Sequence, residues 1–151
     1  MRVVVTGSSG RVGRAIVARL RADGHAVVGL DRAPASTADV IADLGDAAAL
    51  RCALAGAQAV VHTAALHAPH VGVLPDAEFQ RINVDGTRAL LDAATSAGVR
   101  RIVLTSTTAL YGAAAEGVEA AAWIDEDTVP QPQTIYHRTK LAAEALLREA
   151  E

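Results

Sequence analysis

A glycine-rich turn close to the N-terminus constrains the fold of this chain more than any other feature. The run TGSSGRVG, residues 6–13, follows three consecutive valines and precedes residues 11–20, in which apolar side chains recur at helical spacing. A strand, a glycine turn and a helix in this order predict a βα unit. Glycines at positions 7, 10 and 13 allow close backbone approach, and the helix N-terminus offers free N–H groups to an anion such as a pyrophosphate.

The same alternation of strand and helix continues along the chain. Apolar runs predict strands at 26–30, 40–41, 58–63 and 101–106, while helices are expected at 46–55, at 76–97 and from 136 to the end. Residues 112–132 carry glycines, acids and prolines and indicate a loop. Regular alternation predicts an α/β fold, a doubly wound, Rossmann-like parallel sheet of order 3-2-1-4-5 with helices on both faces.

Composition excludes several classes of protein. The 151 residues suit one domain, 51% of them are hydrophobic, and 14 basic against 17 acidic side chains leave no patch that would neutralise nucleic acid. No apolar run approaches the ~18 residues of a membrane span. Cys52 is the single cysteine, so no intrachain disulfide forms, and we expect a small buried side chain in a cytoplasmic protein.

An acidic residue ends the second predicted strand. Asp31 can accept hydrogen bonds from both ribose hydroxyls of NAD and would repel the 2′-phosphate of NADP. Arg32 follows it and can pair with that phosphate, so NADP remains the alternative cofactor.

Tyr136 and Lys140 stand four residues apart, which places them on one face of a helix. An ammonium beside a phenol favours the phenolate form, so the pair can serve as a general acid and base. Ordinary packing of an amphipathic surface helix is the alternative interpretation.

Three further groups of polar residues need an explanation. Hydroxyls in 105–108, at the carboxyl end of a strand, can contact a ligand or cap a loop. Asn83, Asp85 and Gly86 are poor helix formers inside a predicted long helix and indicate a kink or a buried polar role. His67 and His70 can contact substrate or lie in a solvated loop, and two ligands are too few for a metal site, so we expect no metal.

Taken together, these motifs resemble the extended short-chain dehydrogenase/reductase superfamily, the NAD-dependent sugar-nucleotide epimerases and dehydratases. Residues 6–13 match its T-G-x-x-G-x-x-G motif, residues 60–65 look like its h-h-H-x-A-A stretch, and residues 105–112 are similar to its S-S-x-x-h-Y-G stretch. The Y-x-x-x-K motif follows at 136–140.

The resemblance implies a role for each matching residue. Tyr136 is the catalytic acid and base, Lys140 favours its phenolate and holds the nicotinamide ribose, Thr107 bonds to the reacting hydroxyl, and Asn83 supports the site. Asp43 and Leu44 contact adenine, and Ala64 and Ala65 line the nicotinamide side. The full cofactor-binding set is Gly7, Ser9, Gly10, Arg11, Val12, Gly13, Asp31, Arg32, Asp43, Leu44, Thr63, Ala64, Ala65, Tyr136 and Lys140.

The implied activity is oxidation of a sugar or sugar-nucleotide hydroxyl by Tyr-assisted hydride transfer to NAD, in an epimerase, dehydratase or dehydrogenase that forms a homodimer. Members of the superfamily are about twice as long, so residues 1–151 are expected to be an NAD(P)-binding domain that lacks its C-terminal strands and the substrate domain. The fifth strand would then be an exposed edge. A non-catalytic NAD(P)-binding sensor or interaction module is the alternative.

Overall fold

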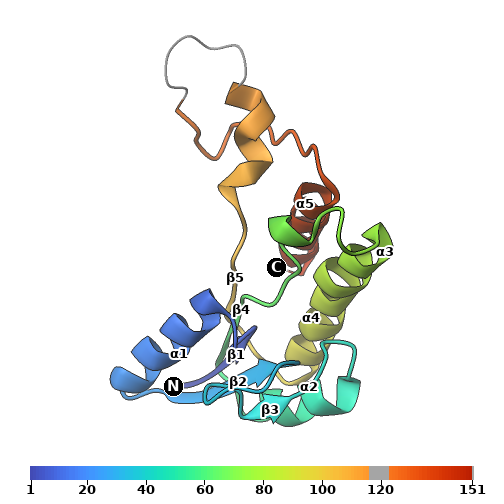
Figure 1. Ribbon diagram of the computed structural model, residues 1–151. Helices are drawn as coiled ribbons and strands as arrows, with labels where there is room; N and C mark the ends of the chain where they lie inside the picture. The colour runs from blue at the N-terminus through green and yellow to red at the C-terminus, as the bar shows by residue number, and fades with distance from the viewer. Residues whose placement is uncertain (116–122, 151) are drawn as a thin grey trace.

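The computed structural model describes residues 1–115 and 123–150, in which helices pack on both faces of a parallel sheet (Figure 1). The sheet has five strands in the order β3-β2-β1-β4-β5, which confirms the predicted order. The strands are β1 (Arg2–Thr6), β2 (Ala26–Asp31), β3 (Val40–Ile41), β4 (Ala59–His62) and β5 (Ile102–Leu104).

Strand β1 lies at the centre of the sheet because its valines are buried on both faces. Val4 is paired with Val28 of β2 and with Val60 of β4. Side chains alternate along a strand, so Val3 and Val5 face one layer of helix and Val4 faces the other. The continuous apolar run of β1 is the pattern expected for a strand covered on both sides.

Helix α1 (Arg11–Ala22) covers one face of the sheet, and three other helices cover the opposite face (Figure 1). Val17 of α1 packs against Val3 and Val5. On the opposite face, Leu54 and Leu90 pack against Val4 and its neighbours. The helices on that face are α2 (Ala47–Leu54), α4 (Gly86–Ser96) and α5 (Ile135–Glu149).

The long helix predicted over 76–97 is interrupted. It divides into α3 (Asp76–Phe79), a π-helical segment η2 (Gln80–Asp85) and α4. The interruption coincides with the poor helix formers, and it turns the side chain of Asn83 inward, where it is 1% exposed. The sequence predicted a kink or a buried polar role, and the structure shows an irregular helix together with a buried Asn83. Two 3₁₀ segments, η1 (Ala68–His70) and η3 (Thr108–Ala115), complete the described elements.

Cys52 is exposed, so the prediction that it is buried is wrong. Leu50, Ala53 and Leu54 form the buried side of α2, and Cys52 lies on the other side of this short helix. Strand β5 is the last strand of the described sheet, and its Val103 is 59% exposed, as expected for an edge.

The loop predicted at 112–132 begins too early, because residues 112–115 belong to the 3₁₀ segment η3. Residues 123–134 contain no helix or strand, and residues 116–122 lie outside the described residues. Trp123, which follows them, is exposed. Within the described ranges, no helix is long and apolar enough to cross a membrane.

Candidate active site

The glycine turn shapes one end of a cavity at the carboxyl end of the sheet. Gly7 has a φ of +70°, and a Cβ at this position would lie 2.6 Å from the main-chain nitrogen of Ala64. A Cβ at Gly13 would lie 2.1 Å from the carbonyl oxygen of Gly7. Gly10 precedes α1 without a capping side chain, so the first N–H groups of the helix remain available to an anion. The turn thus requires its glycines and offers a phosphate site.

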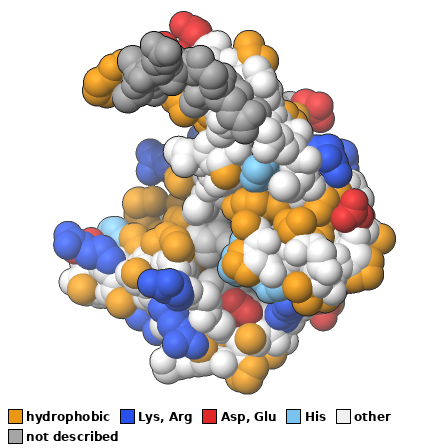
Figure 2. Space-filling model, turned by 45° about the horizontal axis from the view of Figure 1, so that its top comes forward, with side chains coloured by type: hydrophobic (Ala, Val, Ile, Leu, Met, Phe, Trp, Pro, Cys, Tyr) orange, Lys and Arg blue, Asp and Glu red, His pale blue; other side chains and the backbone are white. Residues whose placement is uncertain are grey.

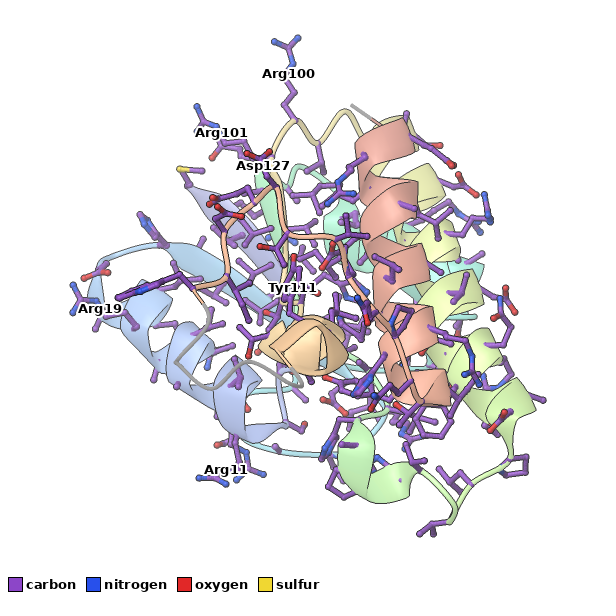
Figure 3. All side chains as sticks on the ribbon, turned by 90° about the horizontal axis from the view of Figure 1, so that it is seen from above. Arg11, Arg19, Arg100, Arg101, Tyr111 and Asp127 are labelled. Carbon is purple, nitrogen blue, oxygen red and sulfur yellow. The ribbon has the colours of Figure 1, made fainter. Side chains whose placement is uncertain are left out.

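The first residues of α1 form the mouth of the cavity beside this turn. Arg11 and Val12 are both exposed and belong to its lining. The side chain of Arg11 extends away from the body of the molecule (Figure 3). The positive charge of Arg11 therefore lies at the rim of the cavity, and main-chain atoms of the glycine turn form the cavity floor at this end.

Asp31 ends β2 at the cavity, and its carboxylate is held in place by main-chain groups. One oxygen, Oδ2, accepts from the N–H of Ser9 at 2.9 Å, and Oδ1 accepts from the N–H of Ala33 at 2.8 Å. Ser9 therefore contributes to the cavity by holding the Asp31 carboxylate in place. Arg32 lines the same end of the cavity and is exposed.

Asp43 and Leu44 follow β3 and line the cavity next to Asp31. Asp43 Oδ1 accepts from the N–H of Gly45 at 2.9 Å and from Nη1 of Arg81 at 3.2 Å. The Gly45 hydrogen bond, followed by the bond and charge of Arg81, lowers the pKa of Asp43 below its ordinary value, and desolvation opposes this. Asp43 is thus a carboxylate at neutral pH, with its second oxygen free of these bonds.

The residues that follow β4 form the next wall. Thr63 donates through Oγ1 to the carbonyl oxygen of Thr6 at 2.7 Å, which ties this wall to the end of β1. Ala64, Ala65 and Leu66 continue it. Small side chains here leave room for a flat ring.

His67 and His70 belong to the lining as well. Their ring centroids are 4.6 Å apart in an edge-to-face arrangement, and the N–H of His67 donates to Nδ1 of His70 at 3.2 Å. His70 Nδ1 is therefore an acceptor, and its Nε2 carries the proton of the neutral ring. In the described residues, no group of three or more His, Cys, Asp or Glu side chains is arranged to hold a metal ion.

Helix α5 brings Tyr136 and Lys140 to the opposite side of this cavity. Lys140 is 4% exposed, and its Nζ donates to the carbonyl oxygen of Thr105 at 2.6 Å. Burial lowers the pKa of Lys140 to about 8, and the charge of Glu144 acts in the opposite direction. Tyr136, one turn earlier, is half-buried. The phenol, the amine and the glycine turn thus share one cavity.

Asn83 lies behind the cavity wall and is not part of its lining. Its Oδ1 accepts from the N–H of Leu66 at 2.7 Å, and its Nδ2 donates to the Leu66 carbonyl at 3.0 Å and to Thr139 Oγ1 at 3.0 Å. The amide therefore joins the wall after β4 to the helix that carries Lys140.

At the end of β5, the cavity is lined by Thr105 and Ser106, whereas Thr107 lies outside the lining and its Oγ1 accepts from the N–H of Ala109 at 3.2 Å. Ser106 donates a short hydrogen bond to Glu144. Ser106 belongs to the hydroxyls at 105–108 that the sequence analysis named as possible ligand contacts. Glu144 was not named from the sequence, and its position one turn beyond Lys140 was the available signal.

The cavity has a volume of about 520 Å³ and opens at the carboxyl ends of the strands. Figure 2 looks onto this end of the molecule and shows hydrophobic side chains on both sides of a hollow. This is where doubly wound sheets bind ligands. The lining residues are Gly7, Gly10, Arg11, Val12, Gly13, Leu30, Asp31, Arg32, Ala42, Asp43, Leu44, Thr63, Ala64, Ala65, Leu66, His67, His70, Ile82, Thr105, Ser106, Tyr136 and Lys140.

The residues present fit a dinucleotide. The glycine turn leaves space that side chains would fill, and it lies beside the N-terminus of α1. The carboxylates of Asp31 and Asp43 lie at the ends of β2 and β3, and Tyr136 and Lys140 lie on the opposite side of the cavity. Fold and site together define a dinucleotide-binding α/β domain of the type found in dehydrogenases.

Comparison with known proteins identifies the family. The model of the NAD-dependent epimerase/dehydratase family matches residues 3–151, and the chain belongs to this family, within the short-chain dehydrogenase/reductase superfamily. A superfamily protein from Agrobacterium tumefaciens, solved with bound NAD, is 39% identical with a TM-score of 0.85 over 99% of this chain. MoeE5, solved with UDP-glucose and NAD, is 35% identical with a TM-score of 0.85 over 99% of this chain.

A 3-beta-hydroxysteroid dehydrogenase from Mycolicibacterium neoaurum is 31% identical over 95% of the chain. The chain spans less than half of each of these three proteins: 44% of the Agrobacterium protein, 49% of MoeE5 and 41% of the steroid dehydrogenase.

Proposed function

We propose that this chain is the NAD-binding part of an enzyme that oxidises a hydroxyl of a sugar or sugar nucleotide, with Tyr136 as the acid and base. The observation that carries the proposal is that Tyr136 and Lys140 line the same cavity as the glycine turn. A phenol placed there reaches the reacting end of a dinucleotide whose pyrophosphate lies on the N-terminus of α1.

Each end of the cavity has a group suited to one part of NAD. The free N–H groups at the N-terminus of α1 would hold the pyrophosphate, and Asp31 would accept from the hydroxyls of the adenosine ribose. The second oxygen of Asp43 accepts from the adenine amine, and Ala64 and Ala65 border the nicotinamide. Because Asp31 is a carboxylate, we propose NAD as the cofactor in preference to NADP.

When bound, NAD⁺ accepts the hydride that leaves the substrate carbon. Tyr136, as phenolate, removes the proton of the substrate hydroxyl and returns it in the reverse direction. The Lys140 ammonium, fixed on the Thr105 carbonyl, stabilises that phenolate and donates to the nicotinamide ribose. By the family resemblance, Thr107 would bond to the reacting oxygen, and it follows Ser106, the last residue of this strand end that lines the cavity.

Relatives support the proposed class of substrate. MoeE5 was solved with UDP-glucose, and this supports a sugar nucleotide, whereas the steroid dehydrogenase shows that related chains act on other alcohols. We propose that residues 1–151 are the cofactor domain of a longer protein. The remaining substrate contacts would come from residues of the kind that the longer relatives have beyond this domain. We also propose that the protein forms a homodimer through α4 and α5.

The experiment is a titration of the chain with NAD⁺ by calorimetry, followed by an assay of the full-length protein with UDP-glucose and other sugar nucleotides. We expect NAD⁺ binding, and we expect Tyr136→Phe to retain that affinity while turnover is abolished. An Ile135→Val variant, one position away on the same helix, is the matched control. Substantial turnover by Tyr136→Phe contradicts the proposal.

A further inference from the structure

Five polar side chains form a buried network between β1, β4 and the helices α4 and α5. They are Thr6, His62, Asn83, Thr87 and Thr139, each no more than 2% exposed. Buried polar groups are costly unless they are hydrogen-bonded, and every one of these five has a partner. We call this set the buried polar network.

The hydrogen bonds of the network can be given directions from Thr87. Its Oγ1 lies 2.7 Å from the carbonyl oxygen of Asn83 and 2.9 Å from Nε2 of His62. A carbonyl oxygen only accepts, so the single hydroxyl proton of Thr87 points to Asn83. The hydroxyl oxygen must then accept from His62, and Nε2 of His62 carries a proton.

The other ring nitrogen of His62 is therefore an acceptor in the neutral ring. Nδ1 lies 2.6 Å from Thr6 Oγ1, which donates to it. Burial lowers the pKa of His62 to about 3, and the positive charge of Lys140 acts in the same direction. Lys140 is the charged group of the described residues whose field reaches this ring, and it disfavours an imidazolium. The ring is thus neutral, with one tautomer selected.

The network reaches both sides of the cofactor cavity. On one side, Thr6 Oγ1 also accepts from the N–H of Ala64 at 3.4 Å, and the Asn83 amide holds the main chain of Leu66. On the other side, the same amide donates to Thr139, the residue before Lys140. Thr139 in turn donates to the carbonyl of Ile135 at 2.9 Å. The Asn83 amide therefore joins the wall after β4 directly to the first turns of α5. His62 is connected to Asn83 through Thr87, which bonds to the main-chain carbonyl of Asn83.

We infer that His62 is a positioning residue: as the Nε2–H tautomer it fixes the wall at 64–66 relative to the helix that carries Tyr136 and Lys140, and so sets the shape of the nicotinamide end of the cavity. The inference deepens the proposed function and rests on it. The adenosine end is built from the glycines that follow Thr6 and from Asp31 and Asp43, and none of these residues bonds to a side chain of the network.

The tautomer is tested directly by ¹⁵N NMR of the imidazole nitrogens in the chain without cofactor. We expect a protonated, pyrrole-like Nε2 and an unprotonated Nδ1 on His62 at neutral pH. An Nδ1–H tautomer, or an imidazolium at pH 6, overturns the assignment. This measurement is independent of the proposed function.

The positioning role is tested by comparing NAD⁺ with ADP as ligands, because ADP occupies only the adenosine end. Thr87→Val keeps the shape of the side chain but removes the acceptor of His62 Nε2–H. We expect about tenfold weaker NAD⁺ binding, because the wall at 64–66 is no longer held in place for the nicotinamide, and ADP binding within about twofold of wild type. Thr87→Ser restores the hydroxyl and should restore the affinity for NAD⁺.

Leu54→Ala, in the core under α2 and away from the cavity lining, is the control for a general loss of stability. We expect it to lower the melting temperature while leaving the ratio of NAD⁺ to ADP affinity unchanged. Equal weakening of both ligands by Thr87→Val, or no weakening of either, overturns the positioning role. If the wild-type chain binds ADP and not NAD⁺, both the positioning role and the proposed function fail. The tautomer assignment is then still decided by the NMR measurement.

Discussion

The ammonium nitrogen of Lys140 lies 2.6 Å from the main-chain carbonyl oxygen of Thr105, so helix α5 is bonded to the strand end where β5 leaves the sheet. This bond fixes a flexible side chain in the cavity wall without using a carboxylate partner. It leaves the remaining two N–H groups of the ammonium for other acceptors. Glu144, one turn further along α5, bonds to Ser106, the neighbour of Thr105, and joins the same two elements again.

The first prediction concerns Lys140→Met. The lowered pKa of Lys140, about 8 against 10.5, means that the fold disfavours its charge by about 3 kcal/mol, and methionine removes that cost. Loss of the bond to the Thr105 carbonyl costs about 1–3 kcal/mol, so the two effects nearly cancel. We expect a melting temperature close to that of wild type, measured by circular dichroism, together with at least about 100-fold lower turnover.

Arg148→Met is the control for this prediction. Arg148 lies on the same helix, its side chain is 72% exposed, and its one described ion pair is with Glu144. It should leave turnover unchanged. A large loss of stability in Lys140→Met would show that the lysine is held for the fold and contradict its role in the site.

The second prediction concerns the glycine turn. An alanine at position 13 would place its Cβ 2.1 Å from the carbonyl oxygen of Gly7, so the backbone must shift, at a cost of about 1–3 kcal/mol. We expect NAD⁺ affinity, measured by calorimetry, to fall more than tenfold because the N–H groups of α1 move. In Gly112→Ala, the control, the new methyl group meets no atom of the described residues within 4 Å and should leave binding unchanged. Equal NAD⁺ affinity of the two variants would exclude the turn as the pyrophosphate site.

Much of the fold follows from local patterns in the sequence. The valines of β1, the glycine turn and the alternation of strands with helices are all short-range signals, and right-handed crossovers then restrict the strand order. Asp31 was found for the same reason, because its position at the end of a strand fixes where its carboxylate lies. Each of these predictions depends on only a few residues that are neighbours in the sequence.

The contacts that organise the site are not local, and this is why they escaped the sequence analysis. Asn83 and Thr139 are 56 residues apart, as are Thr6 and His62, and Ser106 and Glu144 are 38 apart. No periodicity connects such residues. The exposed position of Cys52 was missed for a related reason, since which side of a short helix meets the sheet is decided by packing.

The third prediction concerns the choice of cofactor. Asp31→Asn keeps an oxygen for one of the two N–H bonds from Ser9 and Ala33 but removes the negative charge. We expect NAD⁺ to bind about tenfold less tightly, and NADP⁺ to bind more tightly than to wild type, since repulsion of its phosphate is lost and Arg32 is close. Competition titrations with both cofactors give the ratio. An unchanged ratio would remove Asp31 from cofactor selection.

The last prediction concerns stability in acid and follows from His62. Its pKa is about 3 in the folded chain against 6.5 when unfolded, so between these values the unfolded chain binds more protons. The contribution of His62 to the free energy of unfolding is complete above pH 6.5. It is lost as the pH falls towards 3, by up to about 1.4 kcal/mol per pH unit. The lowered pKa of Asp43 acts in the same direction at lower pH. Urea unfolding between about pH 7 and about pH 4.5 covers the upper part of this loss, because it starts above the unfolded pKa of histidine. We expect His62→Asn, which retains an acceptor for Thr6, to lose much less stability over this range than wild type or the control His25→Asn. Parallel curves for all three proteins would mean that His62 accepts a proton without cost, and that its burial in the network is not maintained in solution.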